Sequence, residues 1–324
     1  MFRQEPPFAV QVELAEGCNL YCDFCGLQGI REQKEKNFKF MTKDTARSLA
    51  DQIRDLGWNP RIEFAMHGEP TMNPDYISIV KIFRRRLPKH HLMMTSNGGG
   101  LLRPPGVVQS LVDLFDAGLN IFAFDAYEYV RIKDKVDTAL LSMPSNAGFD
   151  VHRYPDEKEF SPHNRYGPKA RKFIRVQDIS VASAGTHSVL NNHTGCGSKG
   201  LKRPMEARCA KPFRELAVRW DGNVAICCND WRGYFKVGNV VTDGLDEVWQ
   251  HERMNSARRY LMKGDRKSVY PCTICDAKSY RVGLLPDKKG QQKMRPPNEL
   301  DRKYVSEAVK GKPYTASVKR EYEK

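Results

Sequence analysis

Three cysteines near the start of the chain are spaced closely enough to bind one metal centre. They are Cys18, Cys22 and Cys25, in the stretch EGCNLYCDFCG. A structural zinc site normally closes with four ligands, whereas a cubane iron–sulfur cluster held by three thiolates keeps one iron free for another molecule. The three cysteines by themselves therefore leave open whether they hold a cluster with an open iron or belong to an incidental zinc site.

The elements that must position these cysteines alternate in type over residues 8–127. Apolar runs predict strands, and stretches with apolar residues at helical spacing predict helices between them. The expected strands are 8–14, 61–67, 91–97 and 120–127, and the expected helices are 42–57, 75–88 and 105–118. Such repeated units predict an α/β fold with a parallel sheet, whose chemistry gathers at the carboxyl ends of the strands.

Polar motifs follow three of these strands. MHGEPT (66–71), TSNGGGLL (95–102) and FAFDAY (122–127) close the second, third and fourth expected strands. Gly68 would permit close backbone approach, and Glu69 would accept hydrogen bonds from an ammonium group. Taken alone, SNGGG indicates only a turn.

The cysteine triplet, with an aromatic residue just before its last cysteine, resembles the motif of the radical S-adenosylmethionine (SAM) superfamily. In that family the open iron chelates the amino and carboxylate groups of SAM. Cleavage of SAM then yields a 5′-deoxyadenosyl radical, which abstracts a hydrogen atom from substrate. The resemblance implies an enzyme with a partial (β/α)6 TIM-like barrel and a 4Fe-4S cluster on Cys18, Cys22 and Cys25.

The same resemblance assigns contacts with SAM. The family has a Gly-Glu-Pro motif that holds the SAM amino group, and polar residues at the ends of the next two strands. The expected SAM contacts are Phe24, Gly68, Glu69, Pro70, Ser96, Asn97 and Asp125. His67 stands where the family often has a glycine, and we expect it to be an ordinary hydrogen-bonded histidine.

The last third of the chain resembles the C-terminal extension called SPASM in its long form and Twitch in its short form. The similar segments are residues 209–230, 238–250 and 272–275. Within them, DGNVAICC (221–228) predicts a hairpin, because Asp-Gly and Gly-Asn are turn pairs. Residues 245–264 predict a short helix that braces the hairpin. The resemblance therefore implies a small C-terminal iron–sulfur domain.

The extension is expected to hold a second 4Fe-4S cluster. Its ligand pattern, Cys209-x17-Cys227-x44-Cys272-x2-Cys275, is similar to the Twitch pattern of radical SAM dehydrogenases that act on aminocyclitols. Four thiolates saturate a cubane, so the expected role is electron transfer; a zinc ribbon is the structural alternative. Cys228 stands beside Cys227 and could replace it as ligand.

Residues just before the extension are candidates for work on the substrate. Cys196, in NNHTGCG, is either a buried thiol or, as in related epimerases, a donor of a hydrogen atom. Asn192 and His193 match a polar segment that faces the cavity in relatives, which predicts a contact with substrate.

The expected domains are a radical SAM core over residues 1–208, an auxiliary cluster domain over residues 209–280 and a basic tail over residues 281–324. The formal net charge of +14 points to an anionic partner. The tail carries 12 basic against 6 acidic residues, and its polar, proline-containing composition is typical of a solvated appendage. A polyanion that binds the tail is therefore a second, weaker expectation.

Cysteine usage and hydropathy bear on location. No stretch reaches the roughly 18 apolar residues of a membrane span, and the first residues lack the apolar segment of a secretory signal. Nine cysteines, an odd number at close spacings, favour reduced thiolates that bind metal over disulfides. We expect a cytoplasmic protein with no membrane partner.

Three functions remain open. The leading one is a radical SAM oxidoreductase, or modifier of a small molecule or peptide, that receives electrons from a donor such as flavodoxin or ferredoxin. The second is radical modification of a nucleotide or nucleic acid, prompted by the net charge. The third is a non-catalytic zinc or iron–sulfur protein that binds nucleic acid through its basic tail.

Overall fold

The computed structural model describes most of the chain up to Ala277 and two short strands beyond it. The described residues are 3–22, 25–29, 35–126, 131–143, 147–154, 172–178, 192–197, 200–277, 284–286 and 292–294. Among them, every helix is too short or too polar to span a bilayer.

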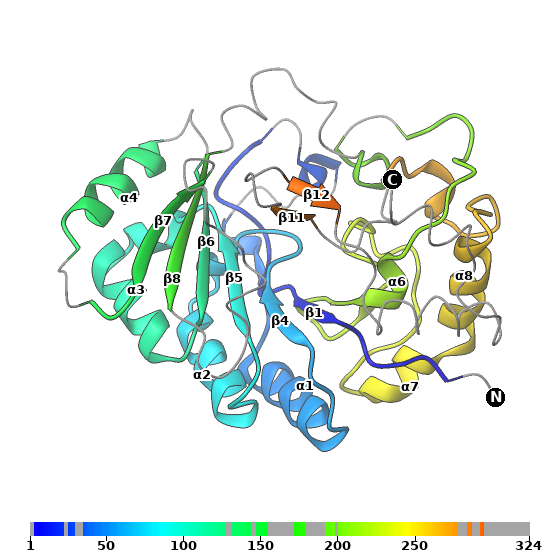
Figure 1. The fold of residues 1–324 in the computed structure, drawn as a ribbon, viewed down its shortest axis with the longest axis horizontal. Coiled ribbons are helices and arrows are strands. Elements are labelled where there is room, and N and C mark those ends of the chain that lie inside the picture. Colours follow the sequence, from blue (N-terminus) through cyan, green and yellow to red (C-terminus); the bar gives the residue numbers. More distant parts are fainter. Residues whose placement is uncertain are drawn as a thin grey trace.

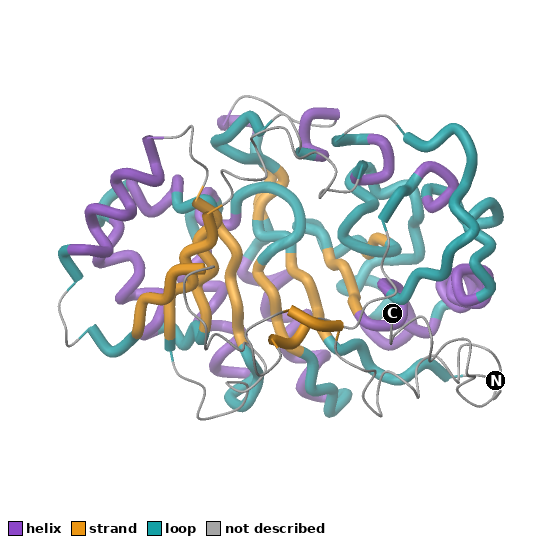
Figure 2. The backbone as a smooth tube through the Cα atoms, turned by 45° about the horizontal axis from the view of Figure 1, so that its top comes forward, coloured by secondary structure: helices purple, strands orange, loops and turns teal. Residues whose placement is uncertain are grey.

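One large sheet carries the site. Its strands are β1 (Ala9–Val12), β4 (Arg61–Phe64), β5 (Leu92–Ser96), β6 (Ile121–Ala126), β7 (Asp150–Tyr154), β8 (Phe173–Asp178), β9 (Glu215–Val218) and β10 (Val224–Ala225). They lie in the order β10, β9, β1, β4, β5, β6, β8, β7, and neighbours are parallel except β9 and β10. Figure 2 shows the strands side by side in one row. The expected α/β fold and its first four strands are confirmed.

Two pairings in the sheet depart from chain order. β8 lies between β6 and β7, with Phe122 opposite Ile174, so β7 forms the edge. β9, which lies beyond residue 208, pairs with β1 through Val10 and Leu216. The auxiliary region is therefore continuous with the sheet of the core.

Helices cover the outer side of the sheet (Figure 1). They are α1 (Lys43–Asp55), α2 (Tyr76–Arg86), α3 (Val107–Asp116) and α4 (Arg131–Leu141). Thr42 caps α1, since its side chain accepts a hydrogen bond from the N–H of Thr45 at 3.1 Å. The three helices expected within residues 42–118 are confirmed.

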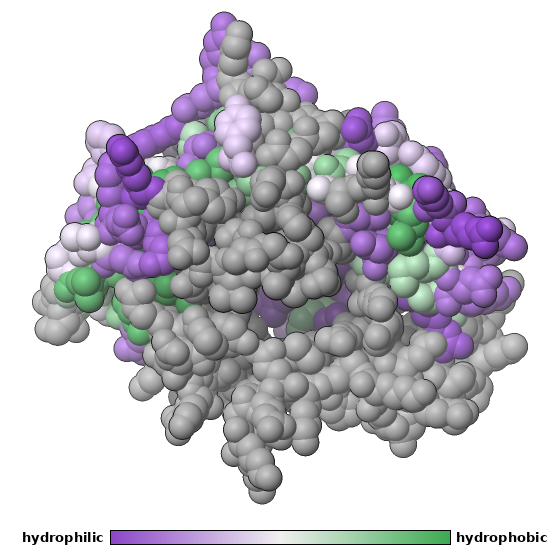
Figure 3. Space-filling model, turned by 90° about the horizontal axis from the view of Figure 1, so that it is seen from above, coloured by the Kyte–Doolittle hydropathy of each residue, from purple (hydrophilic) through white to green (hydrophobic). Residues whose placement is uncertain are grey.

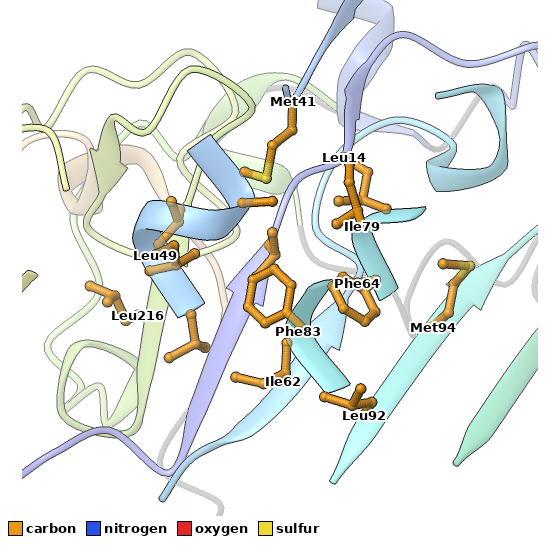
Figure 4. Packing of buried hydrophobic residues seen from close by; sticks show 14 of the residues in the cluster. Leu14, Met41, Leu49, Ile62, Phe64, Ile79, Phe83, Leu92, Met94 and Leu216 are labelled. Carbon is orange, nitrogen blue, oxygen red and sulfur yellow. The ribbon is translucent and has the colours of Figure 1, made fainter. Parts of the chain in front are cut away.

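The core lies between these helices and the sheet. Figure 4 shows Leu49 of α1, together with Ile79 and Phe83 of α2, directed at Phe64 and other strand residues. Phe64 and Phe83 meet edge to face, with ring centroids 5.2 Å apart. Burial of this apolar surface anchors the strands whose ends carry the site.

The C-terminal region is made of short elements: α6 (Lys211–Arg214), α7 (Leu245–Gln250) and α8 (Glu252–Met262). β9 and β10 form the expected hairpin, and its turn uses Gly222 at φ +85°. The prediction of a single helix over residues 245–264 was wrong. The chain breaks at His251, whose backbone is extended (ψ 136°) and whose side chain caps α8 by accepting from the N–H of Arg253.

The remaining elements are short. β2 (Ala15–Glu16) pairs with β3 (Lys39–Phe40), and β11 (Leu284–Pro286) pairs with β12 (Gln292–Met294). The 3-10 turns are η1 (Gly26–Gly29), η2 (Glu35–Asn37), η3 (Pro70–Met72), η4 (Gly99–Leu102), η6 (His193–Gly195) and η7 (Cys272–Ile274). Apart from β11 and β12, the basic tail lies outside the described residues, and its boundary and role stay predictions.

Candidate functional site: two cysteine sites joined by the strand ends

The three-cysteine loop begins just after β1 and β2. Cys22 is buried, whereas Cys18 and Cys25 are half-buried. The N–H of Cys25 donates to the carbonyl of Cys22 at 3.1 Å, which closes a turn between two of the three expected ligands. Phe24, an expected SAM contact, lies outside the described residues.

The thiol of Cys18 is approached by two nitrogen donors. The backbone N–H of Leu20 lies 3.3 Å from its sulfur, and the side-chain amide of Asn97 lies 3.4 Å from it. Hydrogen bonds of this kind stabilise a negatively charged sulfur, which is the form that binds iron. The loop is thus prepared to present Cys18 as a thiolate.

Gly68 brings the Gly-Glu-Pro motif against this loop. It adopts φ +68°, and a Cβ atom there would lie 2.0 Å from the carbonyl oxygen of Ala15 and 2.6 Å from that of Gly17. The next residue, Glu69, donates its N–H to the carbonyl of Gly17 at 2.8 Å. Only glycine permits this close packing of the end of β4 on the entry to the cysteine loop.

The carboxylate of Glu69 joins the ends of β4 and β5. It is 2% exposed, and it accepts hydrogen bonds from the hydroxyl of Thr71 (2.5 Å), the hydroxyl of Ser96 (2.6 Å) and the N–H of Asn97 (2.7 Å). Burial raises its pKa, and these hydrogen bonds oppose that rise. Glu69 therefore organises the neighbouring expected SAM contacts, and its own contact with SAM stays a prediction.

The SNGGG turn folds back over the same point. The N–H of Gly98 donates to the hydroxyl of Ser96 at 2.9 Å, and the amide of Asn97 donates to the side-chain oxygen of Asn19 at 3.1 Å. A Cβ atom at Gly99 would lie 2.0 Å from the amide nitrogen of Asn19. The turn is held directly on the cysteine loop, and the structure adds Asn19 to the polar residues there.

Asp125 is the next expected contact along the sheet. It is half-buried near the end of β6, where its backbone pairs with Gln177 of β8. It thus lies at the same edge as Ser96, since Ser96 is opposite Phe124 in the parallel pair of β5 and β6. The structure brings the motifs of four strands together, as the sequence predicts.

The donor set at this edge fits the groups that the resemblance implies. Three thiols can hold three irons of a cubane, and the surrounding hydroxyl, amide and backbone groups suit a polar cofactor. Seen from above, hydrophilic and hydrophobic residues of the described part are both visible at the centre of the molecule (Figure 3).

The second set of cysteines is buried. Cys209, Cys227, Cys272 and Cys275 are 6% to 9% exposed. Burial raises the pKa of Cys227, Cys272 and Cys275, and in each case the negative charge of neighbouring thiols, Cys209 among them, raises it further. The four sulfurs are therefore close enough to influence one another, which fits a set of thiolates that neutralise the charge of bound iron.

Cys228 has different surroundings from Cys227. Its sulfur lies 3.2 Å from the ammonium nitrogen of Lys211, which also pairs with Glu215 at 3.0 Å. Burial raises the pKa of Cys228, and Lys211 opposes that rise. The geometry therefore favours Cys227 as the fourth ligand, with Cys228 turned toward Lys211.

Within the described part of the chain, no three His, Cys, Asp or Glu side chains converge as ligands of a single metal ion do. A cubane differs in this respect, because each of its irons takes one thiolate and the four sulfurs need not meet at one point. The choice between a cluster and a zinc ribbon thus rests on the chemistry of the donors and on the comparisons below.

Arg266 fastens the loops that carry the buried cysteines. Its side chain is 1% exposed and donates to the carbonyls of Ala207 (2.8 Å), Cys275 (3.3 Å) and Ala277 (2.7 Å). One guanidinium thus ties the segment before Cys209 to the segment after η7. No local pattern in the sequence marks this residue.

Asn192 serves the same loops. It is 1% exposed; its side-chain amide donates to the carbonyl of Ile274 at 2.7 Å, and its backbone N–H donates to Asp276 at 2.6 Å. These bonds hold η7 in place, and the expected contact between Asn192 and substrate stays a prediction.

His193 and Cys196 lie on the next turn. His193 has a left-handed backbone (φ +47°), and its pKa is lowered to about 4, first by burial and then by the nearby His67. Cys196 is buried beside Leu27 and Trp231, and the half-buried Cys18 and Cys25 pack on this group. The roles expected for His193 and Cys196 toward substrate stay predictions.

His67 is hydrogen-bonded through both ring nitrogens, as expected. Nδ1 lies 3.0 Å from the carboxylate of Glu13, and Nε2 lies 2.8 Å from the carbonyl oxygen of Cys228. The ring also stacks on Trp231, with centroids 4.2 Å apart. His67 therefore links the Gly-Glu-Pro motif to the auxiliary loop. Sequence reasoning missed Trp231, because a single tryptophan in a loop has no motif around it.

Two family models match the chain. The Radical SAM superfamily model covers residues 12–136, and the model of the SPASM iron–sulfur cluster-binding domain covers residues 209–279. The first range contains the three-cysteine loop and the motifs of β4 to β6. The second contains the four buried cysteines.

Individual proteins resemble the chain over most of its length. The S-adenosyl-L-methionine-dependent 2-deoxy-scyllo-inosamine dehydrogenase of Niallia circulans is 22% identical over 269 residues, which cover 82% of this chain and 92% of that protein. The GTP 3′,8-cyclase of Edwardsiella ictaluri (strain 93-146) is 22% identical over 303 residues, which cover 79% and 90%.

A solved structure shares the fold. The crystal structure of BtrN in complex with AdoMet and 2-DOIA superimposes with a TM-score of 0.60 at 18% identity, over 90% of this chain and 100% of that one. BtrN in an open conformation gives a TM-score of 0.55 at the same identity. These matches confirm the expected core with a C-terminal cluster domain.

Proposed function

Since this chain belongs to the radical SAM superfamily and carries a SPASM domain, we propose that it is a dehydrogenase of a small polar molecule bearing hydroxyl or amino groups. The family establishes an enzyme that uses SAM and iron–sulfur clusters. The proposal adds the net reaction and the residues that perform it. The observation that carries it is the contrast between the first cysteine set, in which Cys18 and Cys25 are half-buried, and the four buried cysteines of the auxiliary region, whose strand β9 joins the same sheet.

Cys18, Cys22 and Cys25 are proposed to hold the SAM-binding cluster. Bound there, SAM supplies a 5′-deoxyadenosyl radical that removes a hydrogen atom from substrate. Asn97 and Ser96 would orient SAM, because Glu69 fixes both of them at the end of β5. Pro70 stiffens the turn that follows.

The buried thiols are proposed to hold the auxiliary cluster, with Cys227 rather than Cys228 as ligand. Converting an alcohol to a carbonyl removes one hydrogen atom, one electron and one proton from the same carbon and oxygen. The hydrogen atom goes to the radical derived from SAM, and the electron needs an acceptor. Four protein thiolates leave no iron for substrate, so electron acceptance is the role that this site suits. Lys211 supplies a positive charge beside it.

The relatives support the proposed class of substrate, a small polar molecule with hydroxyl or amino groups. The Niallia circulans protein is named as a dehydrogenase of 2-deoxy-scyllo-inosamine, and this chain matches it nearly end to end at 22% identity. Substrate identity does not transfer at that distance, so the proposal is limited to a class: compact, hydroxylated molecules such as aminocyclitols and sugars.

The decisive experiment is a search for the substrate. Anaerobically reconstituted protein with SAM and dithionite would be offered pools of aminocyclitols, sugars and peptides, and 5′-deoxyadenosine would be measured. We expect one hydroxylated small molecule to stimulate its formation, to transfer deuterium into it and to lose two hydrogens overall. Stimulation by peptides alone would contradict the proposal.

A second candidate is cyclisation or another radical modification of a nucleotide. It is favoured by the similarity to a GTP 3′,8-cyclase and by the net charge of +14. Adding GTP and other nucleotides to the same pools tests it. Deuterium transfer from a nucleotide ribose would replace the dehydrogenase proposal.

The reductant is proposed to be a small electron-transfer protein such as flavodoxin or ferredoxin. The chemistry needs a supply of single electrons at low potential, and the cysteine sites bind clusters rather than a flavin or nicotinamide. Reduced flavodoxin should support formation of 5′-deoxyadenosine without dithionite. Failure with both carrier proteins, while dithionite works, would contradict this part.

A further inference from the structure

Trp231 belongs to the auxiliary region yet lies on the three-cysteine loop. It follows Cys227 and Cys228 in the turn after β10, and it is 7% exposed. With Leu27 and Cys196 it forms a small buried group, against which the half-buried Cys18 and Cys25 pack. Trp231 thus brings the auxiliary region against two proposed ligands of the SAM-binding cluster.

The indole ring rests on the backbone beside Cys25. A Cβ atom at Gly26 would lie 2.6 Å from two ring carbons of Trp231, which is impossible without movement. Gly26 therefore allows the ring to approach the loop closely. The contact is part of the packing and not an accident of a mobile side chain.

The other face of the ring is held by groups of the core. His67 stacks on it at 4.2 Å with 28° between the planes, and His67 is itself fixed by Glu13 and by the carbonyl of Cys228. Arg219 donates to the carbonyl oxygen of Trp231 at 3.3 Å. The orientation of the indole is thus determined on both faces.

The indole N–H of Trp231 is a buried donor. Among the described residues, its Nε1 makes no hydrogen bond. A buried donor left unsatisfied costs about 1–3 kcal/mol, so a further hydrogen-bond partner is expected. Cys18 and Cys25 pack against the buried group that contains Trp231, and a cluster held by these thiols would offer sulfurs that accept hydrogen bonds. Water is the competing acceptor, because a cavity of ≈ 420 Å³ also reaches Trp231.

We propose that the indole N–H of Trp231 donates a hydrogen bond to a sulfur of the SAM-binding cluster, so that the auxiliary region sets the reduction potential of that cluster. This inference rests on the proposed function of Cys18, Cys22 and Cys25 as ligands. Hydrogen bonds to cluster sulfurs stabilise the more negative, reduced state and raise its potential. Trp231 is in this sense a positioning residue that couples the two sites.

The first test uses the wild-type chain, so it does not depend on the folding of a variant. Protein containing tryptophan labelled with 15N in the indole is reconstituted and reduced, and pulsed EPR measures nitrogen coupling to the cluster whose signal changes when SAM is added. We expect a 15N coupling in wild type and in Trp220→Phe, and none in Trp231→Phe. Trp220 is the matched control, because its Nε1 already donates to Glu16 at 3.3 Å.

The second test is a redox titration of the same proteins. In Trp231→Phe the ratio of reduced to oxidised SAM-binding cluster at the wild-type midpoint should fall about tenfold, which is 59 mV for a one-electron couple. Trp231→His, which keeps a ring N–H, should recover part of the loss, and Trp220→Phe should match wild type.

The outcomes distinguish failure of the proposed function from failure of this inference. Absence of any cluster signal that responds to SAM in wild type would overturn the proposed function, and this inference with it. A SAM-responsive cluster without 15N coupling, or with unchanged potential in Trp231→Phe, would overturn the inference alone and leave water as the partner of the indole.

Discussion

The two cysteine sites use the same ligand atom in opposite surroundings. Cys18 and Cys25 are half-buried, and the sulfur of Cys18 already receives N–H groups from Leu20 and Asn97. The four cysteines of the auxiliary region are all buried, and a single guanidinium, that of Arg266, ties their loops together. The difference in burial fits the proposal that the first site admits a ligand and the second excludes it.

The difference shows how a protein assigns roles to similar metal centres. An iron can bind SAM only if a coordination position is free and reachable, which the loop after β1 allows. A cluster that only passes electrons needs a thiolate on each of its four irons and exclusion of water. Burial matters because it limits the reorganisation of the surroundings that accompanies a change of charge on the cluster. Each prediction below tests one side of this contrast.

The largest effect is expected on the open side, the proposed SAM-binding site of Cys18, Cys22 and Cys25. Replacing Cys18, Cys22 and Cys25 together by Ala should leave about four of the about eight irons expected per chain, and should abolish SAM cleavage, because no open iron remains. Iron and sulfide analysis with an assay of 5′-deoxyadenosine checks this. About eight irons in the triple variant would show that these cysteines are not ligands.

The next largest effect is expected on the closed side, the proposed auxiliary site of the four buried cysteines. Cys272→Ala with Cys275→Ala should also halve the iron content, yet SAM cleavage and deuterium transfer from substrate should survive while oxidised product disappears. Cys228→Ala is the matched control, since Cys228 faces Lys211, and it should keep full iron. Normal product from the double variant would refute the role in electron transfer.

Arg266→Met should weaken the closed side without removing a ligand. Four carbonyls, those of Ala207, Arg208, Cys275 and Ala277, then lose a donor, and at about 1–3 kcal/mol for a buried group left unsatisfied we expect a loss of several kcal/mol in unfolding free energy. Chemical denaturation measures it. Loss of auxiliary iron should precede loss of SAM-binding iron on titration with a chelator. Simultaneous loss of both would show that Arg266 does not act on the auxiliary loops alone.

Glu69→Gln should have a smaller effect, on the open side. The amide keeps the shape of the carboxylate but turns one acceptor into a donor, opposite the hydroxyls of Thr71 and Ser96 or the N–H of Asn97. We expect SAM to bind about tenfold more weakly, corresponding to about 1.4 kcal/mol, with auxiliary iron unchanged. Ser96→Ala, which removes one of the four donors to this carboxylate, should weaken SAM binding less. Equal SAM affinity in Glu69→Gln would show that this network does not position the cofactor.

The smallest effect is expected from the tail. A chain that ends at residue 280 lacks both β11 and β12. It should keep both clusters and SAM cleavage, since the composition of residues 281–324 is that of a solvated segment. Iron content and 5′-deoxyadenosine formation measure the outcome. A truncated protein that fails to fold would make the tail structural. Loss of turnover only with a polyanionic substrate would favour the nucleotide alternative.

Local patterns in the sequence predicted much of this protein. The apolar periodicity of residues 8–127 predicted four strands and three helices. A strand that buries one face has an apolar residue at every second position, and a helix has one at every third or fourth position. Thr42 marked the start of α1 by its capping hydroxyl. The close spacing of Cys18, Cys22 and Cys25 predicted one metal site, whereas the second set, which spans residues 209–275, was predicted from its resemblance to the SPASM pattern; both ligand sets stay predictions.

What only the tertiary structure decided concerns partners distant in the chain. No local pattern in β8 predicts that it lies between β6 and β7, and none in β9 predicts that it extends the sheet beside β1. Backbone pairing is the same for any strand, so the order of the strands depends on how all the apolar faces are buried together. The preference for Cys227 over Cys228 follows from the position of Lys211. For the same reason Trp231 became visible only when the fold laid the auxiliary loop on Gly26, 205 residues earlier in the chain.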